Sequence, residues 1–166
     1  MILREYIESD AKEILSWIKS ERELRLWSWE RYKDYPVTPK DINDNYNECK
    51  EKGEFYPMTL IDNEKIVGHL ILRYPTEDKT LVRIGFIIIN SDIRGKGYGK
   101  AMLQLGIKFA KEIYGAKKVS LGVFENNKSA YFCYKAVGFQ DVVLEETEKY
   151  VVLGEEWKCL ELEMTL

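Results

Sequence analysis

The stretch Arg94-Gly95-Lys96-Gly97-Tyr98-Gly99-Lys100 lies at the junction between a predicted strand and a predicted helix. Residues 81–89 before it are almost entirely apolar and rich in β-branched side chains, which favours a strand. Residues 99–114 after it carry apolar side chains at helical spacing. Backbone N–H groups at a helix start lack intrahelical partners, and the helix dipole adds partial positive charge there. With three cationic side chains close by, these groups predict a site for a phosphorylated ligand.

The composition is that of an ordinary globular domain. The 166 residues are 45% hydrophobic and 32% charged, with a formal net charge of −3. The chain has no long basic stripe, which argues against bulk nucleic-acid binding. We therefore expect one domain that binds no nucleic acid.

Cysteine usage and hydropathy bear on the compartment. The three cysteines are far apart and odd in number, which favours a reducing compartment over a disulfide framework. No apolar run is long enough to span a bilayer, and the first residues lack a signal-peptide pattern. We expect a cytoplasmic protein with no membrane partner.

The pattern along the chain predicts an α/β fold, or an α+β fold, with one mixed sheet and helices on both faces. Helices are expected after Ser9, after Ser20 and from Thr38 to about Gly53, and again at residues 99–114 and 129–136. The last two predicted strands could pair as a hairpin. Strands are expected at residues 3–7, 56–61, 65–74, 80–89, 118–124, 139–146 and 157–163.

Two other glycine motifs fail at this junction. A P-loop requires Ser or Thr after Gly-Lys, but Ala101 follows Gly99-Lys100. The dinucleotide fingerprint requires a third glycine, and its position falls on Lys100 or on Met102, depending on the starting residue. A nucleotide-hydrolysing switch is therefore disfavoured.

The pattern Arg94-x-x-Gly97-x-Gly99 resembles the pyrophosphate-binding motif of the GNAT superfamily of N-acetyltransferases. A second stretch resembles the other coenzyme motif of that family, with Asn127 followed by Tyr134 and then by Gly138-Phe139. The resemblance is close over about residues 65–140. It is looser toward the N-terminus, which resembles the branch that acetylates ribosomal proteins and small amines. The alternative for the first motif alone is a turn that only closes a strand–helix corner.

The resemblance implies a single N-acetyltransferase domain over residues 1–166. Within it, an acceptor-binding part would occupy about residues 8–53, and a coenzyme-binding core about residues 65–140. It implies a mixed, largely antiparallel sheet and direct transfer of acetyl from acetyl-CoA to a primary amine, without a metal. The acceptor would be a small amine or a protein amino group, and a homodimer is possible.

The resemblance also implies roles for individual residues. Backbone groups of Ile87, Ile88 and Ile89 would pair with the pantetheine arm, and Asn127 would hydrogen-bond it. Tyr134 would contact the coenzyme and protonate the leaving sulfur, since a phenol can protonate a developing thiolate. The alternative for Tyr134 is a packing aromatic. The pyrophosphate would be held by Arg94, Gly95, Lys96, Gly97, Tyr98, Gly99 and Lys100.

The chain departs from the family pattern at the general base. Many relatives carry a glutamate on the strand before the glycine turn, but residues 83–86 include no acid. Others carry it five residues before the motif asparagine, where this chain has Gly122. Glu125 is then the best nearby carboxylate, and His69 is the only histidine, with a pKa suited to proton transfer. The alternatives are a solvated Glu125, a structural His69 and a base supplied through water.

An aromatic stretch lies where relatives bind the acceptor. It comprises Trp27, Trp29, Tyr32 and Tyr35, and such side chains can enclose an amine by cation–π contact. The alternative is that they cover the edge of the sheet or a dimer contact. Because the family's glutamates are missing, a catalytically inactive acyl-CoA-binding regulatory domain also remains open.

Overall fold

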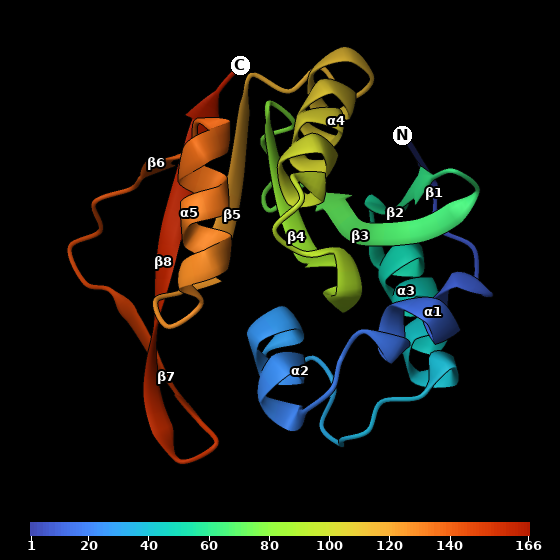
Figure 1. The fold of residues 1–166 in the computed structure, drawn as a ribbon. Helices are drawn as coiled ribbons and strands as arrows, with labels where there is room; N and C mark the ends of the chain where they lie inside the picture. Colours follow the sequence, from blue (N-terminus) through green and yellow to red (C-terminus); the bar gives the residue numbers. More distant parts are fainter.

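A mixed sheet runs through the molecule, and the computed structural model describes residues 1–166 (Figure 1). Its strands are β1 (Ile2–Glu5), β2 (Phe55–Asp62), β3 (Lys65–Arg73), β4 (Leu81–Ile89), β5 (Lys118–Phe124), β6 (Gln140–Asp141), β7 (Glu148–Val152) and β8 (Glu155–Thr165). Their order in the sheet is β1-β2-β3-β4-β5-β8-β6, and β7 also pairs with β8. Only β4 and β5 run parallel. The predicted mixed, largely antiparallel sheet is confirmed.

Helices cover both faces of this sheet, as predicted (Figure 1). The helices are α1 (Asp10–Ser16), α2 (Glu21–Ser28), α3 (Pro39–Lys52), α4 (Tyr98–Glu112) and α5 (Lys128–Val137), with a short 3₁₀ turn at Ser91–Ile93. The first three helices lie over what we call the N-terminal face, and α4 and α5 lie over the opposite face. None of the helices is both long and apolar enough to cross a bilayer.

Each face has its own apolar core. On the α4–α5 side, Leu70 and Leu121 from the sheet pack with Met102 from α4, and all three are fully buried. On the N-terminal face, Trp17 and Ile71 belong to a second cluster. A third, small cluster comprises Phe124, Val152 and Trp157 near the β7–β8 hairpin. The N-terminal face therefore has two separate apolar patches, with polar sheet residues between them.

Local signals explain the helix starts. Thr38 accepts the backbone N–H of Asp41, whose carboxylate accepts the backbone N–H of Thr38, so the capping box at this helix is complete. Pro39 occupies the first turn of α3, where its missing N–H costs nothing. The Ser20 side chain caps α2 by accepting the backbone N–H of Glu23.

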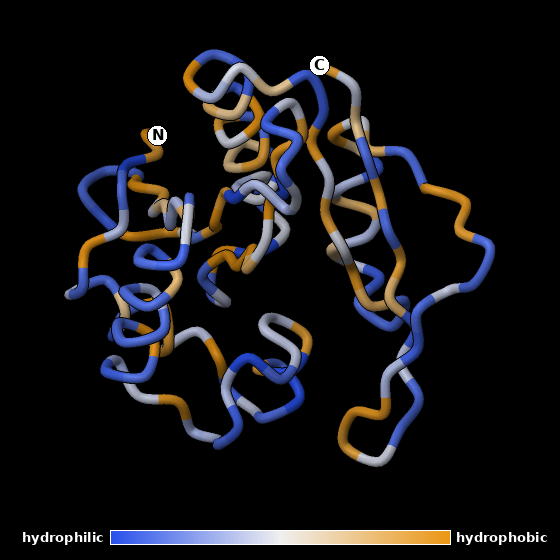
Figure 2. The backbone as a smooth tube through the Cα atoms, turned by 180° about the vertical axis from the view of Figure 1, so that it is seen from behind, coloured by the Kyte–Doolittle hydropathy of each residue, from blue (hydrophilic) through white to orange (hydrophobic).

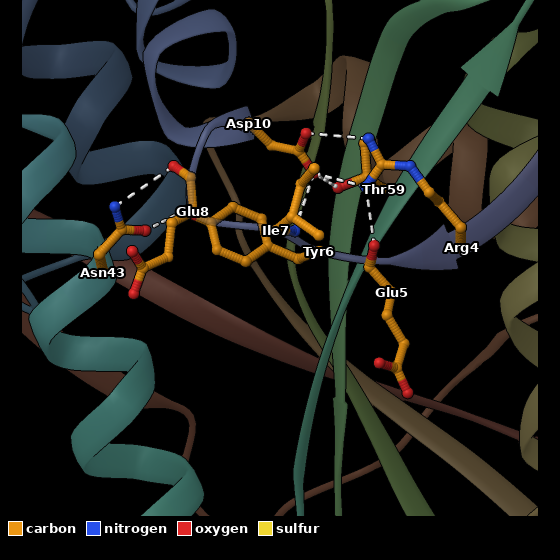
Figure 3. Close-up of polar contacts among 8 residues, drawn as sticks. All are labelled: Arg4, Glu5, Tyr6, Ile7, Glu8, Asp10, Asn43 and Thr59. Atoms are coloured by element: carbon orange, nitrogen blue, oxygen red, sulfur yellow. Dashed lines mark hydrogen bonds and ion pairs between the residues drawn. The ribbon is translucent and has the colours of Figure 1, made fainter.

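A buried carboxylate ties β1 to the first helix (Figure 3). The Asp10 side chain is nearly inaccessible, and it accepts two hydrogen bonds from the Arg4 guanidinium, at 2.7 and 2.9 Å. It also accepts the hydroxyl of Thr59 and the backbone N–H of Ile7. Burial alone would raise the pKa of Asp10, but these hydrogen bonds lower it overall. The network fixes α1 against the sheet.

The end of the chain differs from the prediction. The expected strand at residues 139–146 is wrong beyond Gln140–Asp141, and the segment that follows is a loop in which Val143 is almost fully exposed. The hairpin partner of β8 is β7, joined through a turn in which Leu153 and Gly154 both have positive φ. Figure 2 shows this hairpin projecting from the body with hydrophobic residues at its tip. The apolar residues 142–144 therefore lie in the loop between β6 and β7 and do not form a strand.

The two parallel strands separate partway along their length. Pairing between β4 and β5 stops after Arg83 and Ser120. Beyond that point the register between β3 and β4 also shifts, between His69 and Ile71, and Phe86 adopts a φ of 48°. Such an irregularity bends a strand and redirects its side chains. The bend opens a gap between the C-terminal halves of β4 and β5.

Candidate active site

A cavity of about 430 Å³ occupies the gap between β4 and β5. Its walls come from the bent end of β4, the glycine turn, the first turn of α4, one side of α5 and part of α2. The cavity therefore joins the two stretches that the sequence analysis singled out, residues 94–100 and 127–134.

The glycine turn forms an open cradle at one end. Gly95 and Gly97 have φ of 78° and 86°, and a Cβ added at either would meet no protein atom within 4 Å. Helix α4 begins directly after Gly97 without a side-chain cap, so its first N–H groups are left for another partner. Arg94 and Lys100 line the same region, while Lys96 does not. This concave, cationic helix start fits a phosphate group.

Arg94 also holds the turn in place. Its Nε donates to the carbonyl oxygen of Ile89 at 3.2 Å, and its Nη1 lies 3.7 Å from the carboxylate of Glu23 on α2. Glu23 in turn accepts the backbone N–H of Lys19 at 2.6 Å. The guanidinium thus links the end of β4, the glycine turn and α2.

The bent half of β4 supplies an unpaired strand edge. Ile87, Ile88 and Ile89 all line the cavity, and none of them pairs with β5. Free backbone N–H and C=O groups along such an edge can hydrogen-bond an extended ligand as if it were another strand.

Helix α5 forms the opposite wall. The Oδ1 atom of Asn127 accepts the backbone N–H of Ala130 at 3.4 Å, which leaves its amide NH₂ available near the cavity. Tyr134 lines the cavity although only 6% of it is exposed. Burial raises its pKa above the ordinary value near 10, so the phenol is protonated at neutral pH. A protonated phenol in this position can donate a proton or a hydrogen bond.

The four aromatic side chains of the predicted acceptor site lie in different places in the structure. Trp27 lines the cavity, and Tyr32 stacks behind it with ring centroids 6.3 Å apart. Trp29 packs on Tyr150 of the hairpin at 4.4 Å, and it does not line the cavity. Tyr35 lies outside the cavity too, in an exposed loop. Of the four, only Trp27 lies where it can touch a ligand directly.

The two candidate bases lie away from the cavity. His69 is fully buried under the N-terminal helices, with its Nε2 atom 2.7 Å from the Tyr46 hydroxyl, and burial lowers its pKa to about 3. Glu125 is exposed, 3.9 Å from the ammonium group of Lys158. Neither lines the cavity, so we leave both out of the proposed machinery.

The structure adds cavity residues that the sequence analysis missed. Ser129, Ala130 and Cys133 line the wall formed by α5, where helical spacing from Asn127 and Tyr134 points to the same face. A Cβ on Gly99 would lie 3.3 Å from the Cys133 sulfur, so Gly99 permits the close approach of α4 and α5. The other additions, Ile18, Glu23, Leu26, Gly85, Phe86, Ile93, Leu103, Gly122 and Val123, have no recognisable local signal.

The cavity combines an open, cationic helix start with an unpaired strand edge in the gap between two diverging strands, features that suit an extended phosphorylated ligand. The model of the acetyltransferase (GNAT) family matches residues 13–139, and the chain belongs to this family. The resemblance found in the sequence motifs is thereby confirmed.

Curated relatives share the middle of the chain. The probable spermine N(1)-acetyltransferase of Bacillus subtilis subsp. natto is 33% identical over 98 residues, which cover 56% of this chain and 64% of that protein. The N-alpha-acetyltransferase of Sulfurisphaera tokodaii is 38% identical over 102 residues, 56% of this chain and 60% of that protein. The chain therefore matches less than two thirds of the length of these relatives.

Solved structures share the whole fold. The spermidine N-acetyltransferase of Vibrio cholerae, in complex with CoA and spermine, has a TM-score of 0.81 at 16% identity. The similarity covers 99% of this chain and 94% of that one. At this identity, the similarity shows the fold and leaves the substrate open.

Proposed function

We propose that the protein is an acetyl-CoA-dependent N-acetyltransferase that acetylates a primary amine. The observation that carries this proposal is the cavity itself, which brings the open glycine cradle, the unpaired edge of β4 and the protonated Tyr134 into one continuous space. Family membership and the named activities of the relatives support it.

Each wall of the cavity has a role in this proposal. The N–H groups after Gly97, with Arg94 and Lys100, hold the pyrophosphate of acetyl-CoA. The free edge at Ile87–Ile89 and the amide of Asn127 hold the pantetheine arm. A backbone N–H of the same edge faces the acetyl oxygen, where it can stabilise negative charge in the transition state. The amine approaches from the N-terminal face, beside Trp27.

The transfer step needs two proton movements. The lone pair of the neutral amine forms a bond to the acetyl carbon, and the bond from that carbon to sulfur breaks. Tyr134 gives its proton to the departing sulfur, and a water molecule relays the proton lost by the amine nitrogen to the Tyr134 phenolate. Water takes this part because no carboxylate in the positions that relatives use lies at the cavity.

The proposed acceptor is a primary amine, either a small amine or an amino group of a protein. Relatives include enzymes named for spermine and spermidine and an enzyme named for a ribosomal protein alanine. Both branches, a small amine and a protein amino group, therefore stay open on the comparisons alone. The cytoplasmic location and the homodimer stay predictions.

The test is release of free thiol from acetyl-CoA in the presence of a panel of small amines and short peptides. The proposal expects a thermal shift with acetyl-CoA alone and steady thiol release with at least one amine. Stabilisation without turnover on any amine would instead favour the alternative, an inactive acyl-CoA-binding domain. If acetyl-CoA gives no thermal shift and no amine gives thiol release, both the proposed enzyme and the inactive acyl-CoA-binding domain are excluded.

A further inference from the structure

Two arginines face each other directly on the N-terminal face of the sheet. Arg73 on β3 and Arg83 on β4 are cross-strand partners in the sheet register, so their side chains leave the same face side by side. Like charges in this arrangement repel each other and are destabilising unless an anion lies between or beside them. Both side chains are partly buried.

The carboxylates nearby neutralise Arg83 but not Arg73. Glu161 on β8 binds Arg83 with both carboxylate oxygens, one of them 3.0 Å from Nη2, and Ser120 accepts a further bond from Arg83 at 3.3 Å. Arg73 forms no ion pair with any carboxylate of the chain. Two other acids on this face already have partners: Glu163 binds Lys118 at 2.9 Å, and Glu148 accepts the hydroxyl of Tyr150 at 2.6 Å.

A third arginine adds positive charge. The Arg31 guanidinium lies 5.1 Å from the centre of the Phe86 ring and 3.4 Å from the sulfur of Cys49, and it has no carboxylate partner either. Burial, followed by the charges of Arg83 and Arg31, lowers the pKa of Arg73. The three guanidinium groups are thus close enough to repel one another.

This cluster adjoins the cavity through two residues that line it. Arg83 is the last β4 residue paired with β5, so its side chain stands where the two strands separate. Gly122 lines the cavity, and a Cβ added there would lie 2.8 Å from Nη2 of Arg83. Phe86, beneath Arg31, lines the cavity as well. None of the three arginines lines the cavity itself, and they lie just outside its wall on the N-terminal face, opposite α4 and α5.

We propose that Arg31, Arg73 and Arg83 form a subsite for an oxyanion group of the acceptor, so that the acceptor is a primary amine that also carries a carboxylate or a phosphate. This inference rests on the proposed function, since it places the acceptor at the open side of the same cavity. Arginine suits either group because its planar fork donates two parallel hydrogen bonds to a pair of oxygens. A polyamine, which carries only positive charges, would be repelled here.

The test compares pairs of amines that differ by one anionic group. L-Ornithine is compared with putrescine, L-lysine with cadaverine and phosphoethanolamine with ethanolamine, with spermidine as a separate arm; the readout is kcat/KM from thiol release. The anionic member should be preferred by at least about ten-fold, a ratio that one charge-assisted hydrogen bond can supply. The first two pairs report on a carboxylate and the third on a phosphate.

Two variants assign the preference to the cluster. Arg73→Met should reduce the ratio within the preferred pair by about ten-fold. Lys118→Met is the matched control, because Lys118 lies on the same face in β5 but is paired with Glu163 at 2.9 Å. The control should keep the ratio of the unaltered protein. Preference for putrescine or spermidine, or an unchanged ratio in Arg73→Met, would overturn the proposal.

A binding measurement separates this inference from the proposed function. With coenzyme A present at saturation, inorganic phosphate should raise the melting temperature of the protein and of Lys118→Met, but not that of Arg73→Met. The same shift in all three proteins, or in none, would contradict the subsite. If phosphate shows the expected pattern while no amine gives thiol release, the anion subsite stands and the proposed transfer activity fails.

Discussion

The indole N–H of Trp27 donates to the carbonyl oxygen of Phe86 at 2.8 Å. Phe86 is the residue with positive φ at the bend of β4, beyond the last β4 residue that pairs with β5. Trp27 lies on α2, so this single hydrogen bond connects α2 with the strand edge that lines the cavity. The contact joins the acceptor side and the coenzyme side of the proposed site.

Trp27→Phe should therefore weaken catalysis more than it weakens the fold. The variant keeps most of the apolar contact area but leaves the Phe86 carbonyl without its donor, which costs about 1–3 kcal/mol when the group is buried. We expect kcat/KM for the acceptor to fall by about ten-fold, because α2 is no longer fixed over the cavity. Steady-state kinetics with thermal melting measure the two effects.

Trp29→Phe is the control for this prediction. Trp29 packs on Tyr150 and has no hydrogen bond from its indole nitrogen, so its replacement should leave kcat/KM nearly unchanged. Equal losses in both variants would show that the aromatic volume matters and the Phe86 hydrogen bond does not.

Tyr134→Phe should keep the affinity for acetyl-CoA and lower turnover. The variant removes only the phenol oxygen from a buried ring that also packs near Phe139, at 6.4 Å between centroids. Loss of a general acid typically costs about 10²-fold or more in rate. Calorimetric titration with acetyl-CoA and steady-state thiol release measure the two quantities.

Tyr131→Phe is the matched control on the same helix. Its hydroxyl bonds the carboxylate of Asp141 at 3.0 Å, and the residue does not line the cavity. Turnover should stay at the level of the unaltered protein. If Tyr134→Phe also turns over normally, Tyr134 has no part in proton transfer.

Gly97→Ala should reduce coenzyme affinity. A Cβ at Gly97 meets no protein atom, so the cost comes from its φ of 86° and from filling the open cradle. A left-handed conformation costs a residue with a side chain roughly 1–2 kcal/mol. Gly115→Ala is the control, since Gly115 has a φ of 66° and equally open surroundings but lies at the far end of α4, away from the cavity.

The two alanine variants should therefore lose similar amounts of thermal stability, and only Gly97→Ala should bind acetyl-CoA more weakly. Titration calorimetry on both proteins decides the matter. Native affinity in Gly97→Ala would argue that the glycine turn is not the coenzyme cradle.

The sequence predicted the parts of the site that depend on local backbone geometry. Glycines with positive φ, an uncapped helix start and a helix bearing Asn127 and Tyr134 leave direct traces in residue type and spacing. The same is true of the start of α3, which the proline after Thr38 and the acid in the first turn predicted. These features involve residues close together in the chain.

The parts that were missed depend on contacts between distant strands. Arg73, Arg83 and Glu161 come together only through the register of β3, β4, β5 and β8, which no local pattern encodes. The strand β7 was missed for a related reason, because β8 lies between β5 and β6 and two short segments, β6 and β7, pair with different parts of its length. Propensity at residues 142–144 favoured a strand, but contact with β8 ends with one hydrogen bond from the N–H of Val142 to the carbonyl oxygen of Glu161.

His69 makes a prediction about stability and pH. The imidazole is neutral in the folded protein, since burial lowers its pKa to about 3, whereas in the unfolded chain it titrates near 6.5. Below pH 6.5 the unfolded state therefore binds a proton that the folded state does not bind. The folded state loses about 1.4 kcal/mol for each pH unit below 6.5, until the pH approaches the folded pKa.

Between pH 7 and pH 5 this difference amounts to a loss of about 2 kcal/mol in the free energy of unfolding. His69 is the only histidine in the chain. The pKa of the buried Asp10 is lowered, so the stability that Asp10 contributes is lost only at lower pH. Urea unfolding at pH 7, 6 and 5 measures the slope. In His69→Gln, which keeps a polar partner for Tyr46, the slope should largely disappear, because no other side chain ordinarily titrates in that range. An equal slope in both proteins would assign the acid sensitivity to groups other than His69.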